Sequence, residues 1–185
     1  MDLTTAVAPQ SIVVNSTSNY TFQGAGTFTG LAGLTKSGSG TLTLSNGGNT
    51  FTGGLVVNGG VVSVTGVGGN TSAGRGTVTV NAAGTLRVAA GNGFGYDPTT
   101  ATFLTLNGGV FDIGAVNVTI SPPIVANGGT FTGSGSLFIG SSGNGVTVNN
   151  DSTISSGIYL QGDTTFTTAA GAALDVGGVI NQQSQ

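Results

Sequence analysis

The 185-residue chain contains no cysteine, no histidine, no glutamate and no tryptophan. Without cysteine it can form no disulfide, no thiol nucleophile and no thiolate metal site. Without histidine and glutamate, the usual acid–base partners of an active site are missing. These absences argue against an enzyme, and we expect no catalytic residue, no cofactor and no metal site in this chain.

Charge is scarce as well. Charged residues make up 5% of the chain, against a usual value of about 25%. The three basic residues, Lys36, Arg75 and Arg87, cannot form the cluster that phosphate backbones require, so we expect no nucleic-acid partner. The uninterrupted apolar runs are only a few residues long, so the chain is not expected to span a membrane. The first ten residues contain neither a basic residue nor a long apolar run, so we expect no signal peptide within the sequence.

Glycine is abundant instead, at 36 of 185 residues. Such a density excludes long helices, because each interior glycine costs about 1 kcal/mol relative to alanine. Disorder is not favoured, because 37% of the residues are hydrophobic and the net charge is only −3. Collagen is excluded by the absence of a three-residue glycine period. Short β-branched and apolar runs alternate with glycine-rich corners, most regularly over Leu31–Val64, which predicts an all-β protein.

A corner asparagine recurs along the chain at steps of 23, 26, 20 and 22 residues, at Asn58, Asn81, Asn107, Asn127 and Asn149. This period is typical of solenoid turns. It predicts one domain over residues 1–185, a right-handed parallel β-helix (β-solenoid) of about 7–8 coils, with the asparagines stacked as a hydrogen-bonded ladder. The Asn-Gly pairs leave an antiparallel barrel or sandwich as the alternative, because Asn-Gly is also the strongest hairpin signal.

Alternate residues of each run should point into the core of such a solenoid. The predicted core residues are Leu42, Leu44, Val62, Val64, Val78, Val80, Leu86, Val88, Phe111, Ile113 and Phe138. The residues between them should face water, among them Thr43, Ser63, Thr79 and Arg87.

Three parts of the chain stand out. We interpret residues 1–26 as a lead-in segment and candidate donor strand, in which Ile12, Val13 and Val14 form a strand-pairing edge. Residues 31–64 show the most regular alternation of short apolar runs and glycine-rich corners. Residues 89–100 predict a protruding loop, because they combine three glycines with a proline.

That loop is the natural place for a partner to bind, and its candidate contact residues are Phe94, Tyr96 and Asp97. Local packing of the two aromatic rings is the stronger expectation. Calcium binding through Asp97 or Asp112 stays open, although the chain has no aspartate-rich calcium repeat.

Three other charged residues have competing interpretations. Asp151 and Asp175 are 24 residues apart and could lie on adjacent coils, as the paired carboxylates of glycoside hydrolysis would require. Turn formation by single aspartates is much the stronger interpretation. Lys36 could donate to the carbonyls of the Ser37–Gly40 turn, but a solvated lysine is the expectation.

From Leu34 the sequence reads LTKSGSGTLTLSNGGNTFTGGLVVNGGVVSV. It resembles the autotransporter-associated β-strand repeat, also called the passenger-associated transport repeat, whose pattern runs roughly LTKxGxGTLTLSGxNTYTGGTxVNxGxLxV. The resemblance covers Leu31–Val64, with Phe51 where tyrosine is usual and Leu55 where threonine is usual. It implies a right-handed parallel β-helix in a large secreted bacterial surface protein, such as an autotransporter passenger, and it carries no catalytic residues.

These observations predict a non-enzymatic structural protein outside the cell or on the bacterial cell surface. We expect the rod to associate end to end with copies of itself, as a fibre or surface stalk, because a solenoid presents an open β-edge at each end. The alternative is an adhesin or glycan-binding fragment of an autotransporter passenger, whose partner would be a host or matrix surface.

Overall fold

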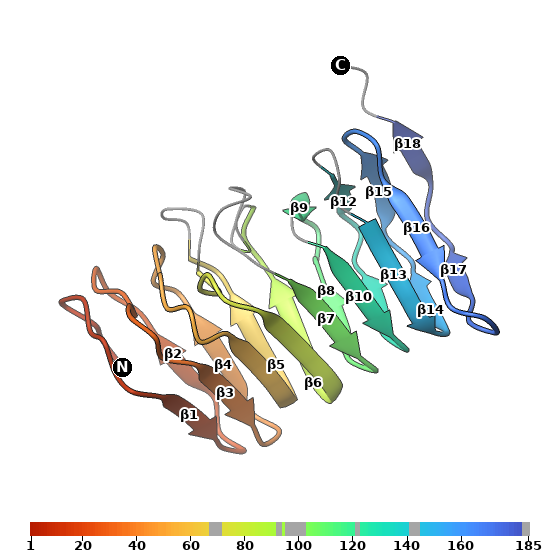
Figure 1. Ribbon diagram of the computed structural model, residues 1–185. Coiled ribbons are helices and arrows are strands. Elements are labelled where there is room, and N and C mark those ends of the chain that lie inside the picture. Colours follow the sequence, from red (N-terminus) through yellow and green to blue (C-terminus); the bar gives the residue numbers. More distant parts are fainter. Residues whose placement is uncertain (67–71, 92–93, 95–102, 121–122, 141–144, 183–185) are drawn as a thin grey trace.

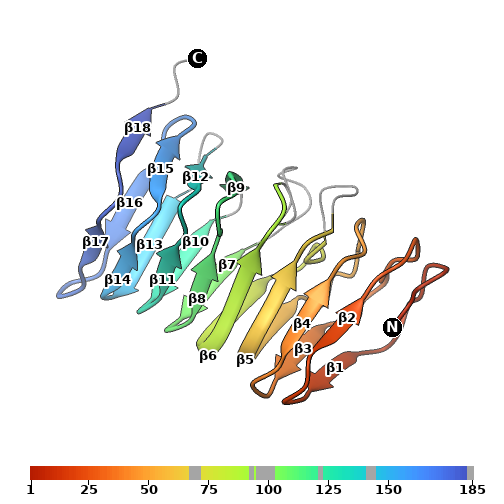
Figure 2. The same ribbon diagram turned by 180° about the vertical axis from the view of Figure 1, so that it is seen from behind.

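The computed structural model describes residues 1–66, 72–91, 94, 103–120, 123–140 and 145–182. Every regular element in these residues is a β-strand, which confirms the predicted all-β class. These residues contain no helix, and therefore none with the length and hydrophobicity to cross a membrane. Figures 1 and 2 show the strands following one another in chain order along an elongated stack.

Each coil of the stack has three sides, which we name by their order along the chain. The first side contains β1 (Ile12–Asn15), β3 (Leu34–Ser37), β7 (Leu104–Asn107), β10 (Ile124–Asn127), β13 (Gly145–Asn150) and β16 (Thr165–Thr168). The second side contains β2 (Tyr20–Phe22), β4 (Thr41–Leu44), β8 (Val110–Asp112), β11 (Thr130–Thr132), β14 (Ser152–Ile154) and β17 (Leu174–Val176). Two longer strands run through the corner and belong to both sides, β5 (Leu55–Val64) and β6 (Val78–Val88).

The third side leads from the second side of one coil to the first side of the next. In the C-terminal half it is a separate four-stranded sheet of β9 (Val118–Ile120), β12 (Ser136–Ile139), β15 (Gly157–Leu160) and β18 (Ile180–Gln182). Near the N-terminus it is formed by isolated bridges, such as Val7 with Phe28.

All pairings between named strands are parallel, which makes the antiparallel alternative wrong for the part of the chain described. Each first-side residue lies beside its equivalent one coil further on, as in the column Ile12, Leu34, Leu55, Val78, Leu104, Ile124, Val146 and Phe166. The column gives eight levels and about seven turns, which confirms the predicted β-solenoid. Stacking is required because one coil cannot bury its own apolar face, whereas neighbouring coils about 4.8 Å apart share one core.

The core is a continuous aliphatic and aromatic column inside the coils. The predicted core residues are buried from Leu42 to Ile113, but the prediction for Phe138 is wrong. Its neighbours Leu137 and Ile139 are the buried pair of β12. Alternation therefore turns Phe138 outward, where its ring stacks on Tyr159 at a centroid distance of 4.8 Å.

One corner shows why glycine is required. Gly60 has a φ of +67°, and a Cβ atom there would lie 2.5 Å from the carbonyl oxygens of both Gly38 and Gly40. The backbones of two successive coils meet too closely at this point for any side chain to fit. The glycine-rich corners of the sequence therefore follow from close coil-to-coil contact as well as from the positive φ.

Candidate functional site

The predicted asparagine ladder is present at the corner between the first and second sides. The side-chain amide of each residue donates to the Oδ1 atom of the asparagine one coil earlier. The four bonds are Asn81 to Asn58 at 2.7 Å, Asn107 to Asn81 at 3.0 Å, Asn127 to Asn107 at 2.8 Å and Asn149 to Asn127 at 2.8 Å. All bonds run in one direction, so the ladder links five coils as a single polar chain of hydrogen bonds.

Lys36 lies one coil before the ladder begins and is buried, so the expectation of a solvated lysine is wrong. Its Nζ atom donates to the carbonyl oxygens of Ser37 (2.8 Å), Gly38 (2.8 Å) and Gly59 (3.2 Å). The bonds to Ser37 and Gly38 agree with the alternative interpretation, and the bond to Gly59, which was not predicted, makes the ammonium bridge the corners of two coils. Burial lowers the pKa of Lys36 from its ordinary value, because the charged form loses its hydration.

A second buried polar group was not predicted. Asn46 and Asn49 are buried and bonded to each other, with Asn46 Nδ2 donating to Asn49 Oδ1 at 2.8 Å. Asn49 also donates to the carbonyl of Ser72 and accepts from the backbone N–H of Phe28, which lie on the coils after and before it. The signal in the sequence was the pair of asparagines flanking Gly47-Gly48 in a corner without alternation. Hydrogen bonds from this pair join three coils, and both side chains are buried.

The candidate contact residues of the 89–100 loop divide into two groups. Phe94 is buried and its ring packs edge-on against the core residue Phe111 at 5.3 Å. Its position agrees with the stronger expectation of local packing, and no ring face remains exposed for a partner. Tyr96 and Asp97 lie outside the described residues.

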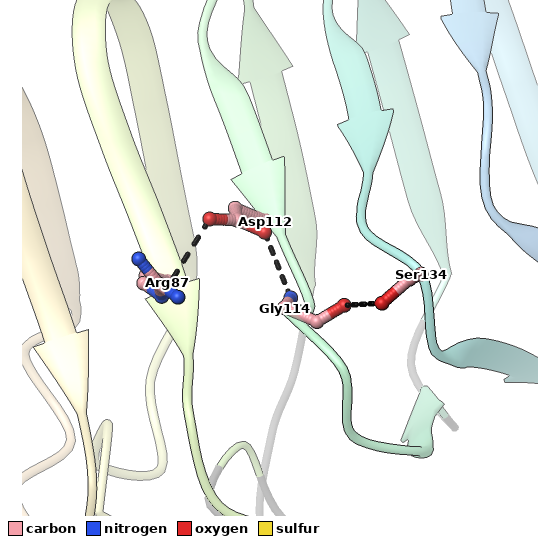
Figure 3. A network of polar contacts seen from close by, with 4 residues as sticks. All are labelled: Arg87, Asp112, Gly114 and Ser134. Atoms are coloured by element: carbon pink, nitrogen blue, oxygen red, sulfur yellow. Dashed lines mark hydrogen bonds and ion pairs between the residues drawn. The ribbon is translucent and has the colours of Figure 1, made fainter.

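Four aspartates lie on the described outer surface of the C-terminal half, where hydrogen bonds occupy two of them. Asp112 Oδ1 accepts from the backbone N–H of Gly114 at 2.7 Å, and its Oδ2 lies 3.7 Å from Arg87 Nε on the preceding coil (Figure 3). Asp151 Oδ1 accepts from the backbone N–H of Ala173 at 2.9 Å. Both aspartates thus stabilise corners. No group of three metal-binding side chains occurs among the described residues.

The N-terminal end of the stack exposes the outer edge of β1, whereas Met1 lies on the outer edge of β2, where its ammonium donates to the carbonyl of Thr21 at 2.7 Å. Val13 and Tyr20 are 68% and 50% exposed, and both line a hollow of about 330 Å³ together with Val14 and Phe22. Ile12 and Val14 are half-buried because β3 covers one side only. Ile12, Val13 and Val14 therefore lie in a strand whose one partner among the described residues is β3, and the pairing of this edge with another chain stays a prediction.

The C-terminal end exposes the outer edges of β16, β17 and β18. Its apolar residues occupy positions that are buried one coil earlier, for example Phe166 above Val146 and Ile180 above Ile158. Phe166 and Ile180 are 37% and 54% exposed. Both ends of the stack therefore present parallel β-edges with core-type side chains, and these two end faces are the candidate interaction sites.

Comparison with known proteins supports the resemblance noted in the sequence. The family model of the passenger-associated-transport-repeat matches residues 34–64, the segment from β3 to the end of β5. No curated protein and no solved structure matches the chain. The repeat family implies a secreted or surface location. The chain is a β-solenoid that carries a passenger-associated transport repeat at residues 34–64.

Proposed function

We propose that this chain is a non-catalytic structural rod of an extracellular passenger, which extends by head-to-tail stacking of copies of itself into a fibre or stalk. The observation that carries the proposal is the match between its two end faces. Both are parallel β-edges of the same two-strand layout, with β1 and β2 at one end and β16 and β17 at the other. Stacking also requires Met1 to leave the edge of β2, where it bonds to Thr21.

The backbone edges are complementary. The N–H groups of Ile12 and Ser16 donate to carbonyls beside β3, and N–H groups alternate sides along a strand. The N–H groups of Val13 and Asn15 therefore point away from the stack and have no partner among the described residues. At the other end Ala169 donates back to Val148, so the N–H group of Thr168 points outward. Each end thus offers the unpaired row that the other needs.

The side chains match as well. Continuation of the stack in register places Phe166 of one copy on Ile12 of the next, and Val176 on Tyr20. These four residues occupy inward-facing columns that are aliphatic or aromatic on every coil between them. Contact would remove their exposed apolar surface from water, at about 25 cal/mol per Å².

Charge favours head-to-tail contact over contact between like ends. Residues 1–88 hold three basic residues and one aspartate, a net charge of +2; the rest hold five aspartates and no basic residue, a net charge of −5, which together give −3. Because chain order follows the axis of the stack (Figure 1), this asymmetry is a charge difference along the rod. Opposite ends attract, whereas two C-terminal ends would bring Asp163 and Asp175 of both copies together.

Two proline variants test the proposal, because each removes an outward N–H without touching the bonds to the neighbouring coil. Val13→Pro should disable the N-terminal end and Thr168→Pro the C-terminal end. Each variant alone should sediment as a monomer at concentrations where the unmodified chain forms rods. An equimolar mixture should form pairs and stop there, because one working end of each kind remains.

Val13→Thr and Thr168→Val are the matched controls, since they alter the same side chains and keep the N–H groups. They should form rods like the unmodified chain. A strictly monomeric unmodified chain at high concentration would overturn the proposal. Dimers formed by a single proline variant on its own would show contact between like ends and would overturn the head-to-tail arrangement.

A further inference from the structure

Residues 2–7 and β18 lie on the same side of the solenoid. Residues 2–7 precede β1 and lie beside residues 23–28, which connect β2 to β3. β18 follows β17 and lies beside β15. Both segments are third-side segments, since the third side is the one between a second-side strand and the next first-side strand. Figure 1 shows β18 in line with β12 and β15 on this side.

This arrangement creates a conflict in the head-to-tail stack. If β1 of a second copy continues the first side above β16, and its β2 continues the second side above β17, then its residues 2–7 come to the level of β18. The place above β15 can hold only one strand. We propose that β18 is a displaceable strand that controls stacking, and that residues 2–7 of a second copy replace it on β15. The inference rests on the proposed head-to-tail association.

Residues 2–7 are the more firmly held of the two competitors. Leu3 is 4% exposed, donates to Gln23 and accepts from Gly26, at 2.8 and 2.7 Å. Val7 donates to Thr27 and accepts from Thr29, both at 2.9 Å. In the stack these residues would keep their own partners on residues 23–29 and gain β15 on their other edge.

β18 is held on one edge only. It has three residues, and Ile180 and the preceding Val179 are 54% and 68% exposed. A hollow of about 430 Å³ lies beside it, lined by Leu160, Ile180 and the corner before β16. The buried Oγ1 atom of Thr164 in that corner has no hydrogen-bond partner. β18 is therefore the segment that is displaced, and stacking must compensate for the loss of its contacts with β15.

Removal and fixation of β18 test this inference on the same chain. A chain that ends at Gly177 should form rods at a concentration at least tenfold lower than the full chain does. Tyr159→Cys with Asn181→Cys places two cysteines on adjacent, register-paired positions, within the usual reach of a disulfide. Because the chain has no other cysteine, oxidation should fix β18 on β15 and keep the protein monomeric, and a reductant should restore assembly.

A third variant asks whether the two segments compete for one place. Deletion of residues 1–8 from the oxidised double-cysteine protein removes the competitor, so this protein should assemble with β18 still fixed. Circular dichroism and melting temperature would establish that each variant keeps the fold.

The outcomes separate the two proposals. If the full chain stays strictly monomeric at high concentration, end-to-end association itself is wrong, whatever the chain ending at Gly177 does. If the full chain, the shortened chain and the oxidised protein all assemble at the same concentration, association stands and control by β18 is wrong. If the oxidised protein stays monomeric after deletion of residues 1–8, the competition for one place is wrong.

Discussion

The asparagine ladder makes a graded prediction, because its central and terminal members have different numbers of bonds. Asn107 donates to Asn81 at 3.0 Å and accepts from Asn127 at 2.8 Å. Asn149 is the last member and makes one ladder bond, to Asn127. Replacement of Asn107 by alanine therefore removes two ladder bonds, whereas the same change at Asn149 removes one.

The magnitude follows from the exposure of the ladder. A hydrogen bond contributes about 0.5–1.5 kcal/mol net to stability, and the lower half of that range applies because water can reach the partners left behind. Asn107→Ala should lower the free energy of unfolding by about 1–2 kcal/mol and Asn149→Ala by about half as much. Asn107→Asp should cost at least as much as alanine, because a carboxylate cannot donate to Asn81 Oδ1 and instead repels it.

Urea unfolding followed by circular dichroism measures these differences. With a slope of about 1–3 kcal/mol per M, Asn107→Ala should lower the midpoint by roughly 0.5–1 M. A double-mutant cycle of Asn81→Ala with Asn107→Ala isolates the bond between them, and a coupling energy should appear. Equal effects of alanine at Asn107 and at Asn149, with no coupling in the cycle, would refute a stabilising role of the ladder.

Three further predictions concern the corner that precedes the ladder. Lys36→Met should lower the free energy of unfolding at neutral pH by about 1–3 kcal/mol, because three carbonyls lose their donor. Since burial lowers the pKa of Lys36 in the folded state, the unmodified chain should become more stable as the pH rises from that lowered pKa toward the ordinary value of about 10.4. Urea titrations of the methionine variant over the same alkaline range should lack this gain. Ser37→Asn should raise the free energy of unfolding by about 1 kcal/mol, since it places an amide between Asn15 and Asn58 and extends the ladder by two coils. An unchanged urea midpoint would show that the corner geometry at this coil does not admit the bonds. Gly60→Ala should cost at least about 1–3 kcal/mol through positive φ alone, and a melting temperature equal to that of the unmodified chain would contradict the close backbone contact there.

The features that repeat along the chain were predictable from the sequence. The spacing of Asn58, Asn81 and Asn107 predicted the coil length and the ladder, because in a solenoid each period places equivalent residues one above the other. Alternation within the strands predicted most of the core for the same reason. A single family-like segment, residues 34–64, was enough to indicate the architecture of the whole stack.

The features that occur once were harder to predict. Lys36 occupies an inward-facing position of β3, where composition alone predicts an apolar residue, and its cage of carbonyls exists only when two coils come together. Phe138 was misplaced because the third side begins at a different point in each coil, so the alternation could not be set from the sequence. The sequence predicted exposed β-edges at the ends of the stack. It did not predict that residues 2–7 and β18 would compete for one place, because that depends on the height of each segment along the axis.

The low charge of the sequence is itself a consequence of the stack. In a parallel, in-register stack every outward position lies about 4.8 Å from its equivalents on the coils before and after it. Like charges at such a distance repel by about 1 kcal/mol per pair even in water, and the cost recurs at every coil. Threonine, serine and asparagine avoid this repulsion and form ladders. Where charged residues do stack in register, they are of opposite sign, as Arg87 and Asp112 are. The scarcity of charge that excluded nucleic acid at the level of sequence is therefore what the outer face of a β-solenoid requires, and the few charges that remain can act over the length of the rod.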